Sequence, residues 1–103
     1  MISQLRIYTI NRGMIDQWVK HFTENLVPLQ EGLGIKIGGM WVNEDKNQFI
    51  WIRSFADDDD LKAKEAAFGA SPDWQAIQGS ARDHLARLDV ITMNAVAKVA
   101  VKA

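Results

Sequence analysis

Two arginines lie inside apolar stretches of this 103-residue chain, and each is the one charged residue of its stretch. Arg6 lies in Leu5–Ile10 and Arg53 in Phe49–Phe55, and both stretches have the β-branched and aromatic content of strands. An unpaired guanidinium is costly to bury, so each arginine needs a partner or a pocket. If the two strands are neighbours, the arginines could share a face and hold the carboxylate of an anionic ligand. The alternatives are pairing with Asp89 or another acid near the sheet edge, and extension to solvent.

His84 is the candidate catalytic residue. At about 100° per residue it lies at the border of a helical apolar stripe that includes Ile77, whereas His21 falls on the polar side of the first helix. A histidine so placed could act as a general base toward a pocket between helix and sheet. The alternative is a half-buried packing residue that makes one hydrogen bond.

Aromatic residues are the third group that could bind a ligand, since a flat apolar molecule stacks well against such side chains. Core packing is the alternative role, because large aromatic residues supply much of the core volume of a small chain. The candidates for ligand binding are therefore the two arginines together with Tyr8, Trp41, Trp51 and Trp74.

Composition excludes several other classes of function. The chain has no cysteine, which removes disulfides and thiolate chemistry, and its net charge of −1 gives no field that attracts nucleic acid. Asp57–Asp60 lacks the ligand spacing of a calcium loop and is typical of a helix start. No metal, nucleotide or other cofactor site is expected. No apolar run is long enough to span a membrane, and no secretory signal is evident, so a cytoplasmic location is predicted.

The elements that position these residues follow from hydrophobic periodicity over a single domain, 1–103. A first helix carries Ile15, Trp18, Phe22, Leu26 and Leu29, and Pro28 is expected to kink or shorten its end. A second begins after Asp57–Asp60 and ends at Gly69, and a third begins at Ser71-Pro72 with the stripe Trp74, Ile77, Ala81, Leu85 and Leu88. The strands are predicted at Leu5–Ile10, Ile35–Val42, Phe49–Phe55 and Leu88–Val99.

This order, strand, helix, two hairpin strands, broken helix and strand, predicts an α+β fold of the ferredoxin-like βαββαβ type with a four-stranded antiparallel sheet. Its strands are apolar on both faces. In one strand the side chains of Phe49, Trp51 and Phe55 point to one face and those of Ile50 and Ile52 to the other. In the strand before it, Ile35, Ile37 and Trp41 are expected on one face, and Met40 and Val42 on the other. The helices can cover one face only, so a second copy of the chain is expected on the other. We therefore predict a homodimer through the sheet face, as a dimeric α/β barrel.

Several short segments, in order, resemble the NIPSNAP family over roughly residues 3–95. They are Leu5–Ile10 with Gly13, Met14–Trp18, Val27–Leu29 before Gly34, Gly39–Trp41, Trp51–Phe55 and Ser71–Gln75. The resemblance implies the same dimeric α/β barrel. The biochemical activity of this family is largely undefined, so the resemblance implies a fold more than a function.

Three functions stay open at this point. The first is a small homodimeric protein that binds an apolar or anionic molecule in an aromatic-lined cavity. The second is a cofactor-independent oxygenase or isomerase, because similar dimeric barrels host such enzymes. Haem-degrading barrels are also similar, but Gly79 rather than His84 aligns with their haem ligand, so haem is not predicted. The third is an interaction module with an occluded cavity.

Overall fold

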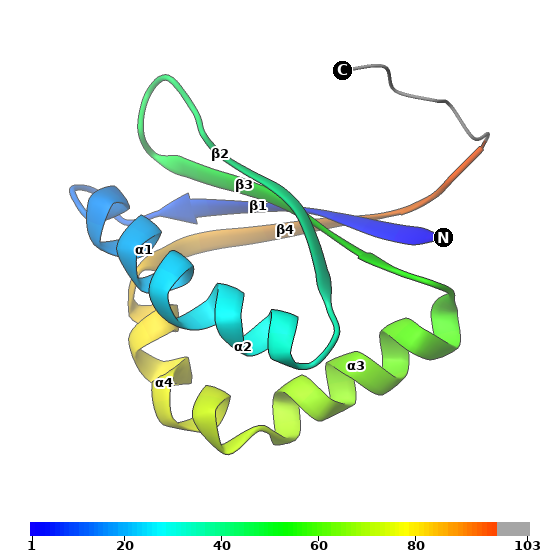
Figure 1. Cartoon of the computed structure of the whole chain (residues 1–103). Helices are drawn as coiled ribbons and strands as arrows, with labels where there is room; N and C mark the ends of the chain where they lie inside the picture. The colour runs from blue at the N-terminus through cyan, green and yellow to red at the C-terminus, as the bar shows by residue number, and fades with distance from the viewer. Residues whose placement is uncertain (97–103) are drawn as a thin grey trace.

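The computed structural model describes residues 1–96. Four strands form one antiparallel sheet in the order β2-β3-β1-β4, and all helices lie on one of its faces (Figure 1). The ferredoxin-like α+β fold predicted from the sequence is therefore confirmed. The elements are β1 Ile2–Ile10, α1 Ile15–His21, η1 Phe22–Leu26, α2 Val27–Gly32, β2 Lys36–Val42, β3 Gln48–Phe55, α3 Asp58–Ala70, α4 Pro72–Asp83 and β4 Leu85–Asn94.

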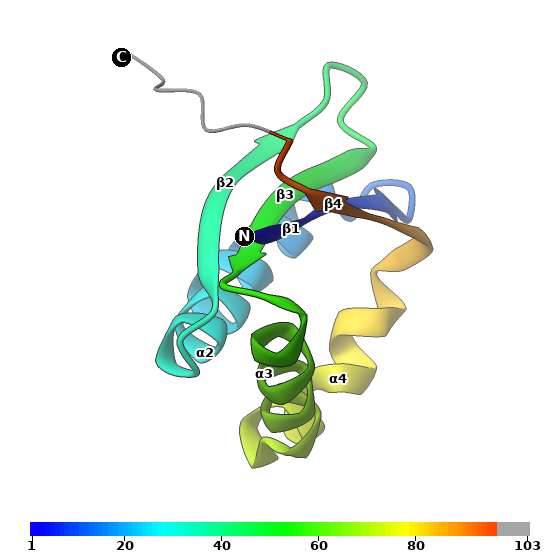
Figure 2. The ribbon, with the colours of Figure 1, turned by 90° about the vertical axis from the view of Figure 1, so that its right-hand side faces the viewer.

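The sheet register determines which side chains face the helices. β1 lies between β3 and β4, with Gln4 opposite Arg53 and Arg6 opposite Trp51. Paired residues point to the same face of a sheet, so these four side chains lie on the side that the helices cover. Within residues 1–96, the other face of the sheet carries no helix, as the view turned by 90° shows (Figure 2).

The first helix does not follow a plain α-helical period. Its middle, η1, is a π-helix, whose wider turn matches a spacing of four residues between Trp18, Phe22, Leu26 and Gln30. These four side chains are buried, whereas the predicted Leu29 is only half-buried. Pro28 does not end the helix; it lies in the first turn of α2, just after the π-helical turn, and the helix continues to Gly32.

The acidic start of α3 is confirmed as a helix cap. The Asp57 carboxylate accepts from the backbone N–H of Asp60 at 2.8 Å, and the Asp60 carboxylate accepts from the N–H of Ala56 at 2.9 Å. The predicted end at Gly69 is wrong by one residue, since α3 runs to Ala70. The helix stops at Ser71 because the following proline disfavours helical backbone there, and Ser71 is extended.

The boundary between α4 and β4 also differs from the prediction. Leu85 and Leu88 were expected on the helical stripe, but α4 ends at Asp83, and both leucines belong to β4. Leu85 is opposite Ile10 in β1, so backbone pairing with β1 extends the strand at the expense of the helix. The predicted end of this strand at Val99 lies outside the described residues.

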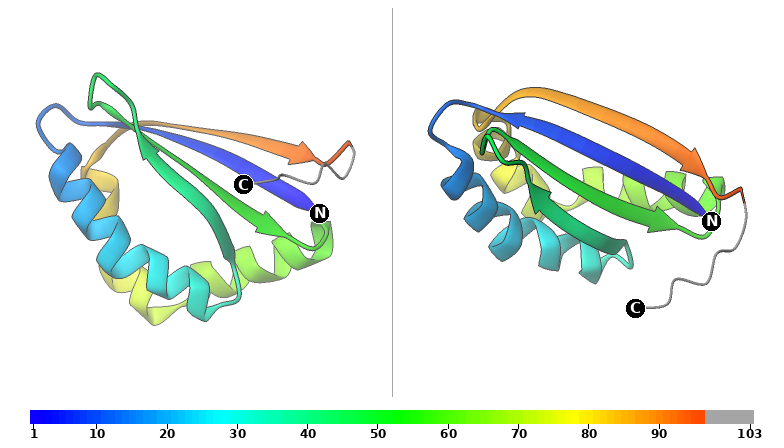
Figure 3. Two further views of the ribbon diagram at one scale, coloured as in Figure 1. Left: turned by 45° about the horizontal axis from the view of Figure 1, so that its top comes forward. Right: turned by 90° about the horizontal axis from the view of Figure 1, so that it is seen from above.

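A bulge in β2 changes the faces of that strand. Ile37 is opposite Arg53, on the helix side, and after the bulge Trp41 is opposite Ile50, on the open side. The prediction that Ile37 and Trp41 share a face is therefore wrong, because one extra residue in a strand reverses the alternation beyond it. Seen from above, β2 lies at one edge of the sheet and β4 at the other (Figure 3).

Candidate functional site

A cavity of about 240 Å³ lies between the helix-covered face of the sheet and the helices. Two of its lining residues, Arg82 of α4 and Leu88 of β4, are exposed, so its mouth lies between these two elements. Its lining comprises Arg6, Tyr8, Trp18, Phe22, Leu26, Gln30, Trp51, Arg53, Phe68, Trp74, Ala81, Arg82, Leu85 and Leu88. Most of these side chains are apolar or aromatic, as is usual for small-molecule sites.

Two guanidinium groups meet at one side of this cavity. Arg6 and Arg53 both donate to Oε1 of Gln4, over 3.0 and 2.8 Å, and Arg6 also donates to the Tyr8 hydroxyl at 3.0 Å. Arg53 has an ion pair with Glu65 of α3 at 2.7 Å, and the Glu65 side chain is 43% exposed. Of these two cations, Arg53 alone has a carboxylate partner among the described residues, and the acceptor that joins the two is neutral.

Arg53 is buried, with 5% of its surface exposed. Desolvation, with a smaller contribution from the charge of Arg6, lowers the pKa of Arg53 to about 10, although Glu65 acts in the opposite direction. The Trp51 ring lies near both cations, with its centroid 5.6 Å from the Arg6 guanidinium carbon and 5.9 Å from that of Arg53. This ring fixes the guanidinium groups by cation–π contacts.

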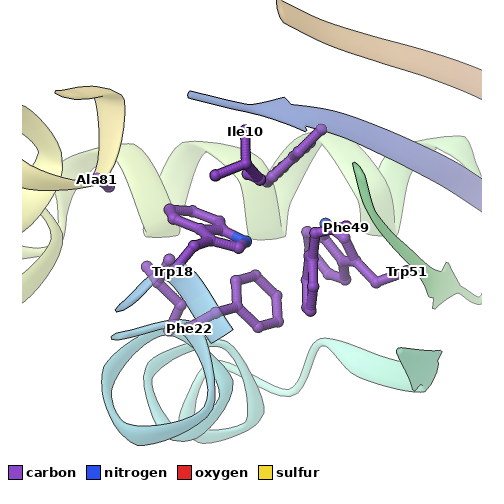
Figure 4. Close-up of a cluster of buried hydrophobic side chains, with 8 residues drawn as sticks. Ile10, Trp18, Phe22, Phe49, Trp51 and Ala81 are labelled. Carbon is purple, nitrogen blue, oxygen red and sulfur yellow. The ribbon is translucent and has the colours of Figure 1, made fainter. Parts of the chain in front are cut away.

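An aromatic cluster adjoins the arginines at the cavity. Phe22 contacts Phe49 and Trp51 with ring centroids 4.7 and 4.9 Å apart, and Trp18 packs beside them (Figure 4). The indole N–H groups of Trp18 and Trp51 are buried and have no hydrogen-bond acceptor within residues 1–96. Buried donors are nearly always paired in proteins, so these two indoles are exceptions on the cavity wall.

Five of the residues predicted for the site line this cavity together. They come from three different elements and are Arg6, Tyr8, Trp51, Arg53 and Trp74. Trp74 packs against Phe68 with ring centroids 4.7 Å apart, which joins α4 to α3 at the cavity.

Trp41 does not line this cavity. It lies on the open face of the sheet, 52% exposed, and its ring lies across Gly39, where an added Cβ would be 2.6 Å from the indole. The side chain is on the opposite side of the sheet from the cavity.

His84 does not line the cavity either. It follows the last residue of α4, and its Nδ1 is 2.7 Å from the Ser80 carbonyl oxygen. Its ring stacks on His21 with a centroid separation of 5.9 Å and is 5.8 Å from Trp18. Burial first, and the charge of His84 second, lower the pKa of His21. This contact matches the packing alternative considered for His84 and lies outside the cavity.

Sequence reasoning missed three polar residues of this site. Gln4 lies two residues before Arg6 on the same strand face, so the alternation of β1 was a usable signal. Gln30 is 2% exposed because the π-helical turn rotates it inward, which a regular helical period does not predict. Arg82 follows the buried Ala81 at the mouth, and no local pattern distinguishes it from other exposed arginines.

Two further findings concern residues 1–96. No cluster of three or more histidine, aspartate or glutamate side chains there could hold a metal ion. None of the described helices is long and apolar enough to cross a membrane. The cytoplasmic location stays a prediction.

The antiparallel sheet of order β2-β3-β1-β4, with helices over one face, defines a ferredoxin-like α+β protein with an arginine-containing aromatic cavity under the sheet. The sequence pattern of one family matches residues 3–98. The chain belongs to the NIPSNAP family.

Solved structures of low sequence identity share this fold. A NIPSNAP domain protein from Burkholderia xenovorans is 18% identical with a TM-score of 0.87, over 94% of this chain and 96% of that one. A NIPSNAP family protein from Agrobacterium tumefaciens is 18% identical with a TM-score of 0.88, over 98% of each chain. SnoaB, a cofactor-independent oxygenase from Streptomyces nogalater, is 13% identical with a TM-score of 0.73, over 97% of each chain. No curated protein sequence matches the chain.

Proposed function

We propose that this NIPSNAP family protein binds a small apolar or anionic molecule in the cavity between helices and sheet. The observation that carries the proposal is the cavity itself, whose wall combines aromatic side chains with Arg6 and Arg53. A dry cavity of roughly 150 Å³ accepts benzene, so about 240 Å³ has room for a one- or two-ring aromatic molecule. The Tyr8 hydroxyl and the arginines supply the few polar contacts that fix orientation in such sites.

Calorimetric titration with 2-naphthoate tests this proposal. Leu88→Trp adds bulk at the exposed mouth and is expected to weaken binding about tenfold or more, by steric exclusion. Ala86→Trp is the matched control, since Ala86 is also exposed in β4 but does not line the cavity. If neither naphthoate nor benzoate binds the wild type, or if Leu88→Trp binds as well as Ala86→Trp, the cavity is not the site.

The same proposal includes a homodimer through the open face of the sheet. The register brings seven apolar side chains to this face, and Trp41 and Ile91 among them are 52% and 49% exposed. They are Leu5, Ile7, Trp41, Ile50, Ile52, Ile91 and Met93. A second copy of this face would cover them, as monomers seldom expose a large continuous apolar patch.

Light scattering after size exclusion tests the dimer. The wild type should have twice the mass of one chain at micromolar concentration. Ile50→Lys, in the middle of the face, should give monomers, because a buried unpaired ammonium is costly. Gln17→Lys, at an exposed position of α1, is the control and should remain dimeric. A monomeric wild type would contradict the dimer.

The alternative function is a cofactor-independent oxygenase or isomerase. It is favoured by the likeness to SnoaB, which is described as a cofactor-independent oxygenase. His84 does not border the cavity, so the groups left to handle protons there are the Tyr8 hydroxyl and the arginines. Oxygen uptake with electron-rich hydroxyarenes tests the oxygenase: saturable uptake that Tyr8→Phe reduces supports it, and no uptake above the protein-free rate contradicts it.

A further inference from the structure

The charged side chains of the cavity wall, among the described residues, are all positive. The described lining residues include three arginines, Arg6, Arg53 and Arg82, and none is an aspartate or glutamate. Guanidinium groups have five N–H donors and no acceptor. The wall therefore offers positive charge and donors, and a ligand that fits it must offer negative charge and acceptors.

Of the two arginines that lie beneath the sheet, Arg6 has weaker charge compensation than Arg53. Its two hydrogen bonds within the described residues go to neutral oxygens, those of Gln4 and Tyr8, whereas Arg53 has the Glu65 carboxylate. Arg6 is half-buried and lines the cavity, so a ligand there would lie beside its charge. A carboxylate is the group that a guanidinium binds best in such a setting.

The indole N–H groups add to this imbalance. Trp18 and Trp51 line the cavity, their indole N–H groups are buried without an acceptor in residues 1–96, and Trp51 also lies against the Arg6 guanidinium. A purely apolar ligand would leave the Arg6 charge without a negative partner. A ligand with a carboxylate supplies that partner and still uses the aromatic wall.

We infer that the ligand class of this cavity is an aromatic carboxylate of one or two rings, with its carboxylate bound by Arg6 and its ring against the Trp18, Phe22 and Trp51 side. This inference rests on the proposed function and narrows it from an apolar or anionic molecule to one that is both. Cationic aromatics are excluded by the three arginines, and flexible aliphatic acids lack the planar surface that stacks on the aromatic wall.

Four probes of similar size separate charge from shape. They are 2-naphthoate, its neutral amide 2-naphthamide, the cation 2-naphthylmethylamine, and octanoate as an aliphatic acid. We expect naphthoate to bind about tenfold more tightly than the amide, because a charge-assisted hydrogen bond is lost with the amide. The amine should not bind measurably, and octanoate should bind about tenfold more weakly than naphthoate.

Two variants test the role assigned to Arg6. Arg6→Met removes the charge but keeps an apolar stem, and Gln4→Glu supplies a carboxylate from the protein to the same guanidinium groups. Each variant should bind naphthoate about tenfold more weakly than the wild type does, and its affinity for naphthamide should stay within about threefold of the wild-type value. Arg12→Met is the control, since Arg12 is exposed in the turn before α1, and it should bind naphthoate as the wild type does.

Gln4→Glu keeps the inference testable if Arg6→Met does not fold, because the substitution is nearly isosteric and places a negative charge between two cations. If naphthamide or octanoate binds as tightly as naphthoate while Leu88→Trp still blocks binding, the ligand class is wrong and the proposed cavity function stands. If Gln4→Glu leaves naphthoate affinity unchanged, the assigned carboxylate position is wrong. If none of the four probes binds, the proposed function itself fails.

Discussion

Arg6 and Arg53 lie on neighbouring strands and donate to the same atom, Oε1 of Gln4, over 3.0 and 2.8 Å. Two like charges are thus joined through a neutral amide in a mostly buried site, where their repulsion is poorly screened. The lowered pKa of Arg53 reflects this setting, after the larger effect of burial.

Gln4→Leu should destabilise the fold, since Gln4 is 6% exposed and its loss leaves both guanidinium groups without their shared acceptor. We expect the free energy of unfolding in urea to fall by about 2 kcal/mol or more. Gln17→Leu at an exposed position of α1 is the control and should change it by less than about 0.5 kcal/mol. Equal values for the two variants would contradict the role of Gln4.

Leu26→Ala should cost about 2 to 5 kcal/mol of unfolding free energy, because Leu26 is 4% exposed in the core cluster. Leu29→Ala should cost at least about 1 kcal/mol less, since the π-helical turn puts Gln30 in the inward position and leaves Leu29 half-buried. Urea denaturation of both variants measures the difference. A larger loss for Leu29 would mean that the regular helical period applies.

Gly34→Ala should be destabilising by about 1 kcal/mol or more, because Gly34 has φ +81° and an added Cβ would lie 3.3 Å from Lys64 Cε. Gly32→Ala is the matched comparison two residues earlier, at the end of α2. Nothing lies within 4 Å of its added Cβ, and its φ is not positive, so the variant should be neutral or slightly stabilising. In thermal melts, the melting temperatures of the two variants should shift in opposite directions or differ by several degrees.

Acidification should weaken the fold through His21. Its pKa in the folded state is below the ordinary 6.5, so the unfolded chain takes up a proton first as the pH falls. Stability is fully present above about pH 6.5 and is lost as the pH falls toward the folded-state pKa. Urea midpoints at pH 7.5 and 5.5 should differ more for the wild type than for His21→Gln.

His84→Gln offers the partner test for that prediction, because the smaller part of the lowered His21 pKa comes from the charge of His84. The wild-type pH dependence should be partly retained in His84→Gln, since burial of His21 is the larger cause. An identical pH dependence in the wild type and in His21→Gln would show that other groups control it.

The sequence was sufficient to predict the element order and the helix cap at Asp57, because these depend on residues close together in the chain. It also predicted that Arg6 and Arg53 would share a face if their strands were neighbours. The β1–β3 pairing meets that condition. Hydrophobic alternation placed Trp51 and Phe55 correctly on one face, since a regular strand alternates without help from its neighbours, but it did not predict that the helices cover this face.

The faces of Trp41 and Gln30 were decided by tertiary structure. One extra residue at the β2 bulge turns Trp41 to the open side of the sheet, and one wide turn in η1 brings Gln30 to the cavity. Each irregularity is a single-residue shift in phase, which local periodicity cannot detect because the residues remain the same. The amino-acid sequence determined which residues could bind a ligand, and the packing of helix against sheet decided which of them meet. Only that packing brings hydrogen-bond donors from β1, the helix that runs from α1 to α2, β3 and α4 around one cavity.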